Sequence, residues 1–128
     1  MKCIFYEKKG GIIAGQIIGL LNASAIEIKI EKIELFKTIR TLSQRLKRPI
    51  DGSAILVLIA GDREDLLRIV AIHELFGLIR IILILPDRED ESVKIGFKLQ
   101  PRFLTYVNGN LSEVQGVLRK MLELSEAD

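Results

Sequence analysis

Hydrophobic residues recur along this chain in short runs, and their spacing alternates between that of strands and that of helices. Two runs of branched apolar residues, AILVLIA at 54–60 and IRIILIL at 79–85, are typical of parallel strands covered on both faces. KCIFY at 2–6 predicts a first strand, and RFLTYV at 102–107 predicts a last one. AIEIKI at 25–30 alternates apolar and polar positions, which predicts a strand nearer the edge of the sheet.

Helical spacing fills the segments between these runs. The glycine-rich stretch 10–22 predicts a first helix, and helices are also expected over Glu64–Phe76 and Glu89–Leu99. The second helix is expected to end before Pro49, and its apolar positions are Leu35, Phe36, Ile39, Leu42 and Leu46. The last helix is predicted from one apolar stripe, formed by Leu111, Val114, Val117, Leu118, Met121 and Leu122.

Five strand–helix units predict an α/β fold with right-handed crossovers and helices on both faces of a parallel sheet. We expect a flavodoxin-like (βα)5 three-layer sandwich with strand order 2-1-3-4-5. The loops are short, and no segment has the composition of a linker, so residues 1–128 are expected to form a single domain.

The composition argues against nucleic acid binding and against a membrane-spanning segment. Apolar residues make up 48% of the chain and charged residues 28%, and the net charge of +2 is too small and too evenly mixed to indicate nucleic acid binding. The uncharged run from Gly10 to Ile26 is shorter than the ~20 apolar residues of a membrane span. Cys3 is the only cysteine, which favours a reducing, cytoplasmic compartment.

A four-residue acidic motif, Asp-Arg-Glu-Asp, occurs twice, at 62–65 and at 87–90, each time after a buried strand and before a helix. The spacing fits an N-cap acid with a second acid at the third helical position, and Asn110 with Glu113 repeats it. The rival interpretation is a metal or phosphoryl site, since ligands bind beyond the carboxyl ends of strands in such folds. Three helix starts with the same chemistry favour capping, and no metal or other cofactor is expected.

Motifs for other chemistry are missing from the sequence. It contains no Gly-x-Gly-x-x-Gly and no phosphate-binding loop ending in Gly-Lys-Ser/Thr. His73 is the only histidine, and its spacing from Leu66, Ile69 and Val70 predicts a packed core residue. Cys3 lies inside the first predicted strand, where a buried thiol behaves as a small hydrophobic side chain.

Gly11, Gly15 and Gly19 fall on one stripe of the first predicted helix. Small residues at this spacing let a helix approach another backbone closely. Tight packing on the domain's own sheet is the favoured interpretation, and a dimer contact is the alternative.

The order of elements, the chain length and the pattern AILVLIA–helix–RIILILP–helix–RFLTYV–helix resemble the receiver domains of two-component response regulators. The resemblance implies an acidic pair after the first strand, a phospho-accepting Asp at the end of the third, a Ser or Thr ending the fourth and a Lys ending the fifth. This chain has Glu7, Ala60, Leu85-Pro86 and Asn108 at or near these places. The resemblance therefore predicts a degenerate pseudo-receiver that is not phosphorylated at the usual Asp.

We expect a non-catalytic signalling or protein-interaction module that acts through a protein partner or as a homodimer. The face through which receivers commonly contact partners would comprise Lys94, Lys98, Arg102, Tyr106 and Arg119. The alternative is a small-ligand or anion-binding protein, possibly an enzyme, that uses the carboxyl edge of the sheet. Its site would comprise Glu7, Lys8, Asp62, Asp87 and Asn108.

Overall fold

The structure, a computed structural model, describes residues 2–8, 10–23, 32–50 and 53–126. Its strands are β1 (Lys2–Glu7), β2 (Lys32–Phe36), β3 (Ala54–Ile59), β4 (Arg80–Leu85) and β5 (Phe103–Tyr106). Its α-helices are α1 (Ile12–Ala23), α2 (Ile39–Leu46), α3 (Arg63–Ala71), α4 (Asp90–Phe97) and α5 (Leu111–Glu126). A 3₁₀ helix, η1 (His73–Phe76), follows α3.

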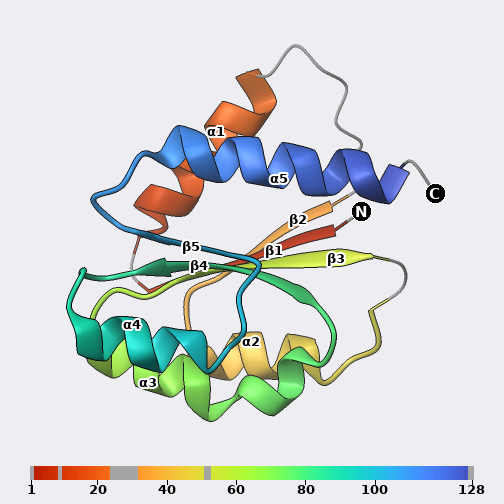
Figure 1. Cartoon of the computed structure of the whole chain (residues 1–128). Helices are drawn as coiled ribbons and strands as arrows, with labels where there is room; N and C mark the ends of the chain where they lie inside the picture. The colour runs from red at the N-terminus through yellow and green to blue at the C-terminus, as the bar shows by residue number, and fades with distance from the viewer. Residues whose placement is uncertain (1, 9, 24–31, 51–52, 127–128) are drawn as a thin grey trace.

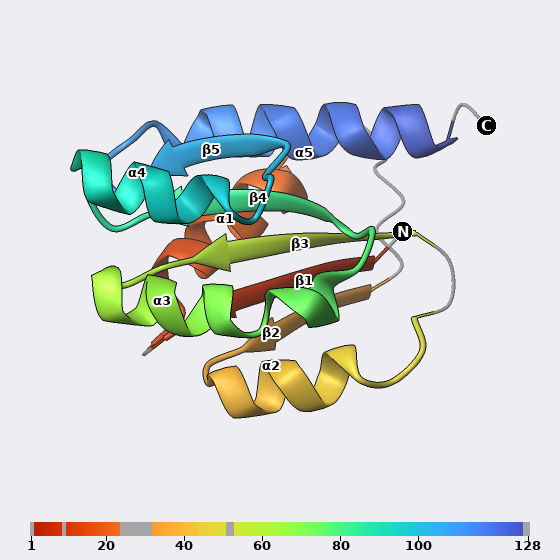
Figure 2. The same ribbon diagram turned by 60° about the horizontal axis from the view of Figure 1, so that its bottom comes forward.

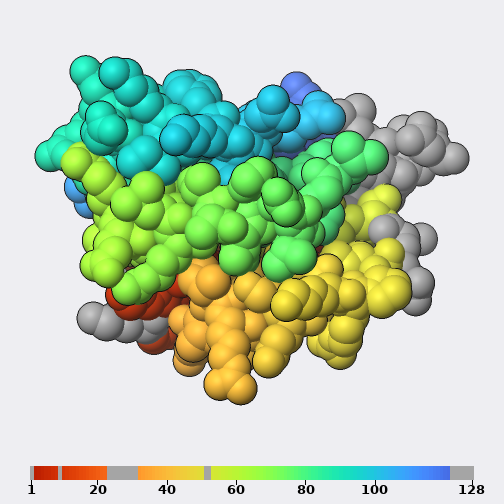
Figure 3. Space-filling model, turned by 90° about the horizontal axis from the view of Figure 1, so that it is seen from below, coloured from red at the N-terminus to blue at the C-terminus, as the bar shows by residue number. Residues whose placement is uncertain are grey.

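The strands form one five-stranded sheet in the order β2-β1-β3-β4-β5, and every neighbouring pair is parallel. Helices α1 and α5 cover one face, and α2, α3 and α4 cover the other (Figure 1). Figure 2 shows the strands side by side in this order, and Figure 3 shows α2, α3 and α4 lying next to one another over their face. The predicted flavodoxin-like sandwich with order 2-1-3-4-5 is confirmed.

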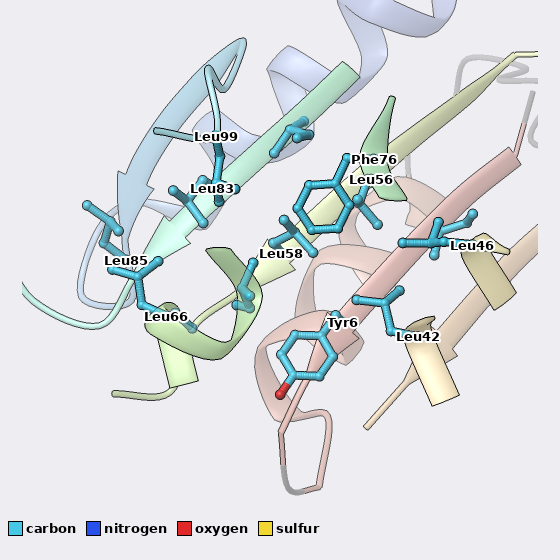
Figure 4. Packing of buried hydrophobic residues seen from close by; sticks show 14 of the residues in the cluster. Tyr6, Leu42, Leu46, Leu56, Leu58, Leu66, Phe76, Leu83, Leu85 and Leu99 are labelled. Atoms are coloured by element: carbon cyan, nitrogen blue, oxygen red, sulfur yellow. The ribbon is translucent and has the colours of Figure 1, made fainter. Parts of the chain in front are cut away.

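Alternation along the strands divides the core in two. Leu56, Leu58 and Leu83 point toward α2–α4, where Tyr6 and Phe76 join them (Figure 4). Ile4 belongs to the same cluster. Their chain neighbours point to the opposite face and pack under α1 and α5, among them Phe5, Val57 and Ile82. Both faces of the three central strands are thus buried, which is why these strands read as continuous apolar runs.

The second strand differs from its prediction. Leu35 and Phe36, expected on the second helix, belong to β2, where they pair with Phe5 and Tyr6 of β1. The segment 25–30, predicted as this strand, lies outside the described residues. Leu35 and Phe36 fit a helical spacing with the apolar residues of α2, and β2 is a half-exposed edge strand whose own apolar signal is weak.

The helix predicted over Glu64–Phe76 is also shorter than expected. α3 ends at Ala71, Ile72 leaves the α-helical geometry, and η1 continues with the tighter 3₁₀ winding. The change rotates His73 away from the apolar stripe, so the prediction of a core histidine is wrong. His73 is exposed, and its Nδ1 lies 2.8 Å from the backbone oxygen of Val70.

Among the described residues, no helix combines the length and the apolar character needed to span a membrane.

Candidate functional site

The carboxyl edge of the sheet carries the five residues predicted as a ligand site. Glu7 ends β1 and Lys8 follows it, while Asp62, Asp87 and Asn108 come shortly after β3, β4 and β5. Because the strands are parallel, all five residues lie at one edge of the sheet. Their acidic groups, however, are each directed to a different helix start.

Glu7 caps the first helix. Its Oε1 accepts a hydrogen bond from the backbone N–H of Ala14 at 2.8 Å, and its Oε2 accepts one from Ile13 at 3.2 Å. The carboxylate is buried and faces the unpaired amides and the positive end of the α1 dipole. An acid at the end of β1 therefore binds its own backbone rather than open solvent.

Asp62 caps α3 as predicted. Its Oδ1 accepts from the backbone N–H of Asp65 at 2.7 Å. Asp65, the acid at the third helical position, is fully buried. Its Oδ2 accepts from the N–H of Gly61 at 3.0 Å, and its Oδ1 accepts from the phenol of Tyr6 at 2.7 Å.

Tyr6 was not recognised in the sequence as a polar residue of this edge, because it lies in an apolar strand and its partner is far away in the chain. Burial, and then the hydrogen bond to Asp65, raise the pKa of the Tyr6 phenol above its usual value. Its neutral hydroxyl thus stays a donor to the buried carboxylate.

The second acidic motif makes a different structure. Glu89, not Asp87, is the N-cap of α4, and it makes no side-chain capping bond, so the predicted cap at Asp87 is wrong. Asp87 Oδ1 accepts from the N–H of Glu89 at 3.0 Å, closing a local turn before the helix. A hydrogen bond from Ser92, the Glu89 amide and the nearby Arg63 lower the pKa of the Asp87 carboxyl.

Arg63 and Arg88, the arginines of the two acidic motifs, contact side chains of neighbouring elements at this edge. The guanidinium of Arg63 forms an ion pair with Glu89 and donates from Nε to the buried Ser92 hydroxyl at 3.3 Å. The guanidinium of Arg88 lies 4.5 Å from the ring centre of Tyr106. These contacts link the start of α3 to the start of α4, and the segment before α4 to the end of β5.

The arrangement offers no cage for a cation. Within the described ranges, no three His, Cys, Asp or Glu side chains are grouped so that they could hold a metal ion. Ala60, which stands next to the end of β3, is buried, and its N–H donates to the backbone oxygen of Ile84. Lys8 is partly buried and Asn108 is exposed.

A cavity of about 260 Å³ lies at the opposite, amino edge of the sheet. It is bounded by the segments that lead into β4 and β5. Its lining residues are His73, Phe76, Gly77, Leu78, Ile79, Arg80, Ile81, Lys98, Leu99, Gln100 and Arg102. Four of these lining residues are basic, namely His73, Arg80, Lys98 and Arg102, and no Asp or Glu is among them.

The cavity has an apolar floor and a polar rim. Phe76, Ile81 and Leu99 are buried members of the core under α2–α4. Lys98, Gln100 and Arg102 are exposed, as is His73. Arg80 lines the cavity, but its Nη1 is directed to the other face of the sheet, 3.5 Å from the backbone oxygen of Met121.

Two residues of the cavity wall have left-handed backbone conformations. Gly77 has a φ of 55°, and Gln100 has a φ of 50°, the only positive value for a non-glycine residue in the described part of the chain. For a residue with a Cβ this conformation costs about 1–2 kcal/mol. The strain at Gln100 carries no sequence signature.

The predicted partner face separates into two parts. Lys94 on α4 and Lys98, the C-cap of that helix, are exposed, and with Phe97 they occupy one side of it; Phe97 is 61% exposed. Arg102 is exposed beside them. Tyr106 is partly buried beneath Arg88, and Arg119 is partly buried on α5.

The glycine stripe does not pack on the sheet. Gly11 is buried and precedes α1 with a φ of 66°, but Gly15 and Gly19 face outward, and a Cβ at either position would meet no atom within 4 Å. The favoured prediction of tight internal packing is therefore wrong for these two glycines. They share the outer side of α1 with Ile12, which is 71% exposed, and with Gln16 and Leu20.

Cys3 is fully buried in β1, as predicted. Burial raises the pKa of its thiol to about 11, although the chain's amino terminus and Arg80 act in the opposite direction. A protonated, inaccessible thiol is suited to packing rather than to nucleophilic chemistry.

No protein-family model, curated protein or solved structure matches this chain.

Proposed function

We propose that this protein is a non-catalytic signalling or protein-interaction module with a receiver-like fold, and that it is not phosphorylated at the position usual for receivers. One observation carries the proposal. At the edge where this fold class places its chemistry, the carboxylates of Glu7, Asp62 and Asp87 each accept hydrogen bonds from backbone amides.

Glu7 supports the proposal most directly. A divalent cation at this edge would need a carboxylate that converges with others on octahedral geometry. Both oxygens of Glu7 are instead held by the first turn of α1, so turning them toward a cation would leave the buried amide of Ala14 and the part-buried amide of Ile13 without this acceptor. A lost hydrogen bond of this kind costs about 1–3 kcal/mol.

A contact surface on α4 supports the interaction role. We call Lys94, Phe97 and Lys98 the α4 face. An exposed aromatic ring between two cations is the composition found in protein interfaces, where aromatic side chains supply apolar area and charges set orientation. The partner proposed for this face carries acidic side chains around an apolar contact.

Beryllofluoride with Mg²⁺, a mimic of a phosphorylated aspartate, tests the first half of the proposal. We expect the amide signals of Glu7, Ala60, Asp62 and Asn108 in ¹⁵N–¹H spectra to stay unchanged when both are added together. A new set of signals confined to these residues, dependent on both Mg²⁺ and beryllofluoride, would show an acceptor site and refute the proposal.

Photo-crosslinking in cells tests the second half. A photoreactive amino acid at position 97 is expected to give one discrete product, and Lys94→Glu is expected to suppress it. Position 67 is the matched control, because Leu67 is a half-exposed apolar residue on the neighbouring helix α3. Equal labelling from both positions, or a product that Lys94→Glu leaves unchanged, would remove the support for the α4 face.

A further inference from the structure

The cavity at the amino edge shares Lys98 with the α4 face but otherwise lies outside the proposed function, and its lining combines three properties of a ligand site. It is concave, its floor is apolar, and the charged side chains at its rim are all of one sign. Elsewhere in the described residues, the surface cations Arg63 and Arg68 stand beside carboxylates, and so does the buried Arg45. At the cavity, no acidic residue contributes to the wall.

We infer that this cavity binds a small organic anion that carries a phosphate or carboxylate group on a short apolar body. Lys98 and Arg102 would hold the anionic group. Arg102 is two residues before Leu104, whose side chain packs in the core under α4, so strand alternation directs Arg102 to the same side of the sheet. Lys98 approaches from the end of α4, which places the two cations on the same segment leading into β5.

The apolar body would rest on Phe76, Ile81 and Leu99. These side chains form the wall of the cavity nearest the core, and each is less than one tenth exposed. Leu78, which is fully exposed, stands at the rim and would be covered in part by a bound ligand. A volume of about 260 Å³ is just below the ~300 Å³ at which ligand pockets usually begin, which fits a small metabolite-sized anion rather than a nucleotide.

Gln100 adds an independent indication. Its left-handed backbone lies in the cavity wall, and the N–H of Gln100 donates to Phe97 while that of Leu99 donates to Gly96. The chain is thus held in a tight turn that keeps Lys98, Gln100 and Arg102 at one opening. Strained backbone of this kind is concentrated at functional sites.

Phenyl phosphate, inorganic phosphate and phenol are the probes that separate the two parts of the site. In ¹⁵N–¹H titrations of the whole chain, phenyl phosphate is expected to shift the amides of Gly77, Leu78, Leu99 and Gln100 in a saturable way. It is expected to bind more tightly than either inorganic phosphate or phenol. Benzoate in a parallel titration shows whether a carboxylate serves in place of the phosphate.

Three single variants test the residues. Arg102→Gln and Lys98→Gln are each expected to weaken phenyl phosphate binding roughly tenfold or more, because each removes a charge-assisted hydrogen bond. Lys94→Gln removes the same charge one turn earlier on α4, outside the cavity, and is expected to change binding by less than about twofold. All three positions are exposed, so the variants are expected to keep the fold, which their spectra would show directly.

Two results would overturn the inference. One is the absence of saturable shifts at the cavity. The other is a loss of binding in Lys94→Gln as large as that in Arg102→Gln, which would mean general attraction to a basic surface. Neither result bears on the beryllofluoride test at the opposite edge of the sheet.

Discussion

The phenol oxygen of Tyr6 lies 2.7 Å from Oδ1 of Asp65, which joins β1 to the first turn of α3 across 59 positions of the chain. Tyr6 is 1% exposed and Asp65 is fully buried. The second carboxylate oxygen accepts from Gly61, so the buried acid is satisfied on both sides. This small network fixes where α3 begins relative to the sheet.

Replacing Tyr6 by Phe is expected to lower the free energy of unfolding by about 1.5–3 kcal/mol, because a buried carboxylate loses one of its two donors. Urea denaturation measures the change. Tyr106→Phe is the matched control, since Tyr106 is only partly buried and its recorded contact with Arg88 is through the ring face. An equal loss in the two variants would mean that the Tyr6 hydroxyl contributes nothing specific.

Alkaline pH should act through the same hydroxyl. The pKa of Tyr6 is raised in the folded state, so the unfolded chain loses this proton first as the pH increases. The stabilisation is fully present below pH 10, the ordinary tyrosine value, and is lost as the pH rises above it. Urea midpoints measured on both sides of pH 10 are expected to fall more steeply in the wild type than in Tyr6→Phe.

Ionisation of the Cys3 thiol is expected to lower the stability of the fold over a second, defined range of alkaline pH. Its pKa is about 11 in the fold against 9.0 ordinarily, so its contribution of about 2–3 kcal/mol is present below pH 9 and disappears by pH 11. Cys3→Ala is expected to remove this part of the pH dependence. A thiol reagent at neutral pH should label the native chain far more slowly than the chain in urea; fast native labelling would contradict the burial of Cys3.

Two helical glycines should respond to alanine in opposite directions. A Cβ at Gly96 would lie 2.9 Å from Leu83 Cδ2 and 3.1 Å from Leu85 Cδ2, so Gly96→Ala is expected to cost about 1–3 kcal/mol by crowding α4 against β4. A Cβ at Gly116 of α5 would meet no atom within 4 Å outside the backbone of its own helix. Gly116→Ala is therefore expected to raise the free energy of unfolding by about 0.5–1 kcal/mol. Thermal unfolding of both variants checks the close approach of α4.

Alanine variants of the outward glycines of α1 test whether solvent or a second copy of the chain covers that side of the helix. If solvent covers the helix, Gly15→Ala and Gly19→Ala should each stabilise by about 0.5–1 kcal/mol without changing the mass in solution. Light scattering over a range of concentrations provides the mass. A dimer in the wild type that dissociates in these variants would assign the stripe to a subunit contact.

The sequence predicted the central sheet well because its signal is local. β3 and β4 are buried on both faces, so nearly every residue is branched and apolar, and their position could be taken directly from the composition of the runs. The caps at Asp62 and Asn110 were also predictable, since each side chain binds an amide two or three residues along the chain.

The remaining features depend on contacts between distant segments. β2 was misplaced because Leu35 and Phe36 satisfy both a strand and a helix period, and only their pairing with β1 decides between them. The prediction for His73 was wrong because it continued the helical spacing of α3 past Ala71, where that helix ends. The burial of Asp65, the turn at Gln100 and the cavity at the amino edge of the sheet arise from packing, for which a single sequence holds no direct signal.

The way Glu7 is engaged limits what this domain can become. Its two oxygens hold the first turn of α1, so any substitution that released the carboxylate for a cation would also loosen a helix over the sheet. Phosphotransfer at this edge would require a replacement acceptor for those amides before the new activity arose. Glu7, Asp62 and Asp87 stabilise backbone amides in this fold. A variant that used them to bind a cation instead would first have to lose part of its stability.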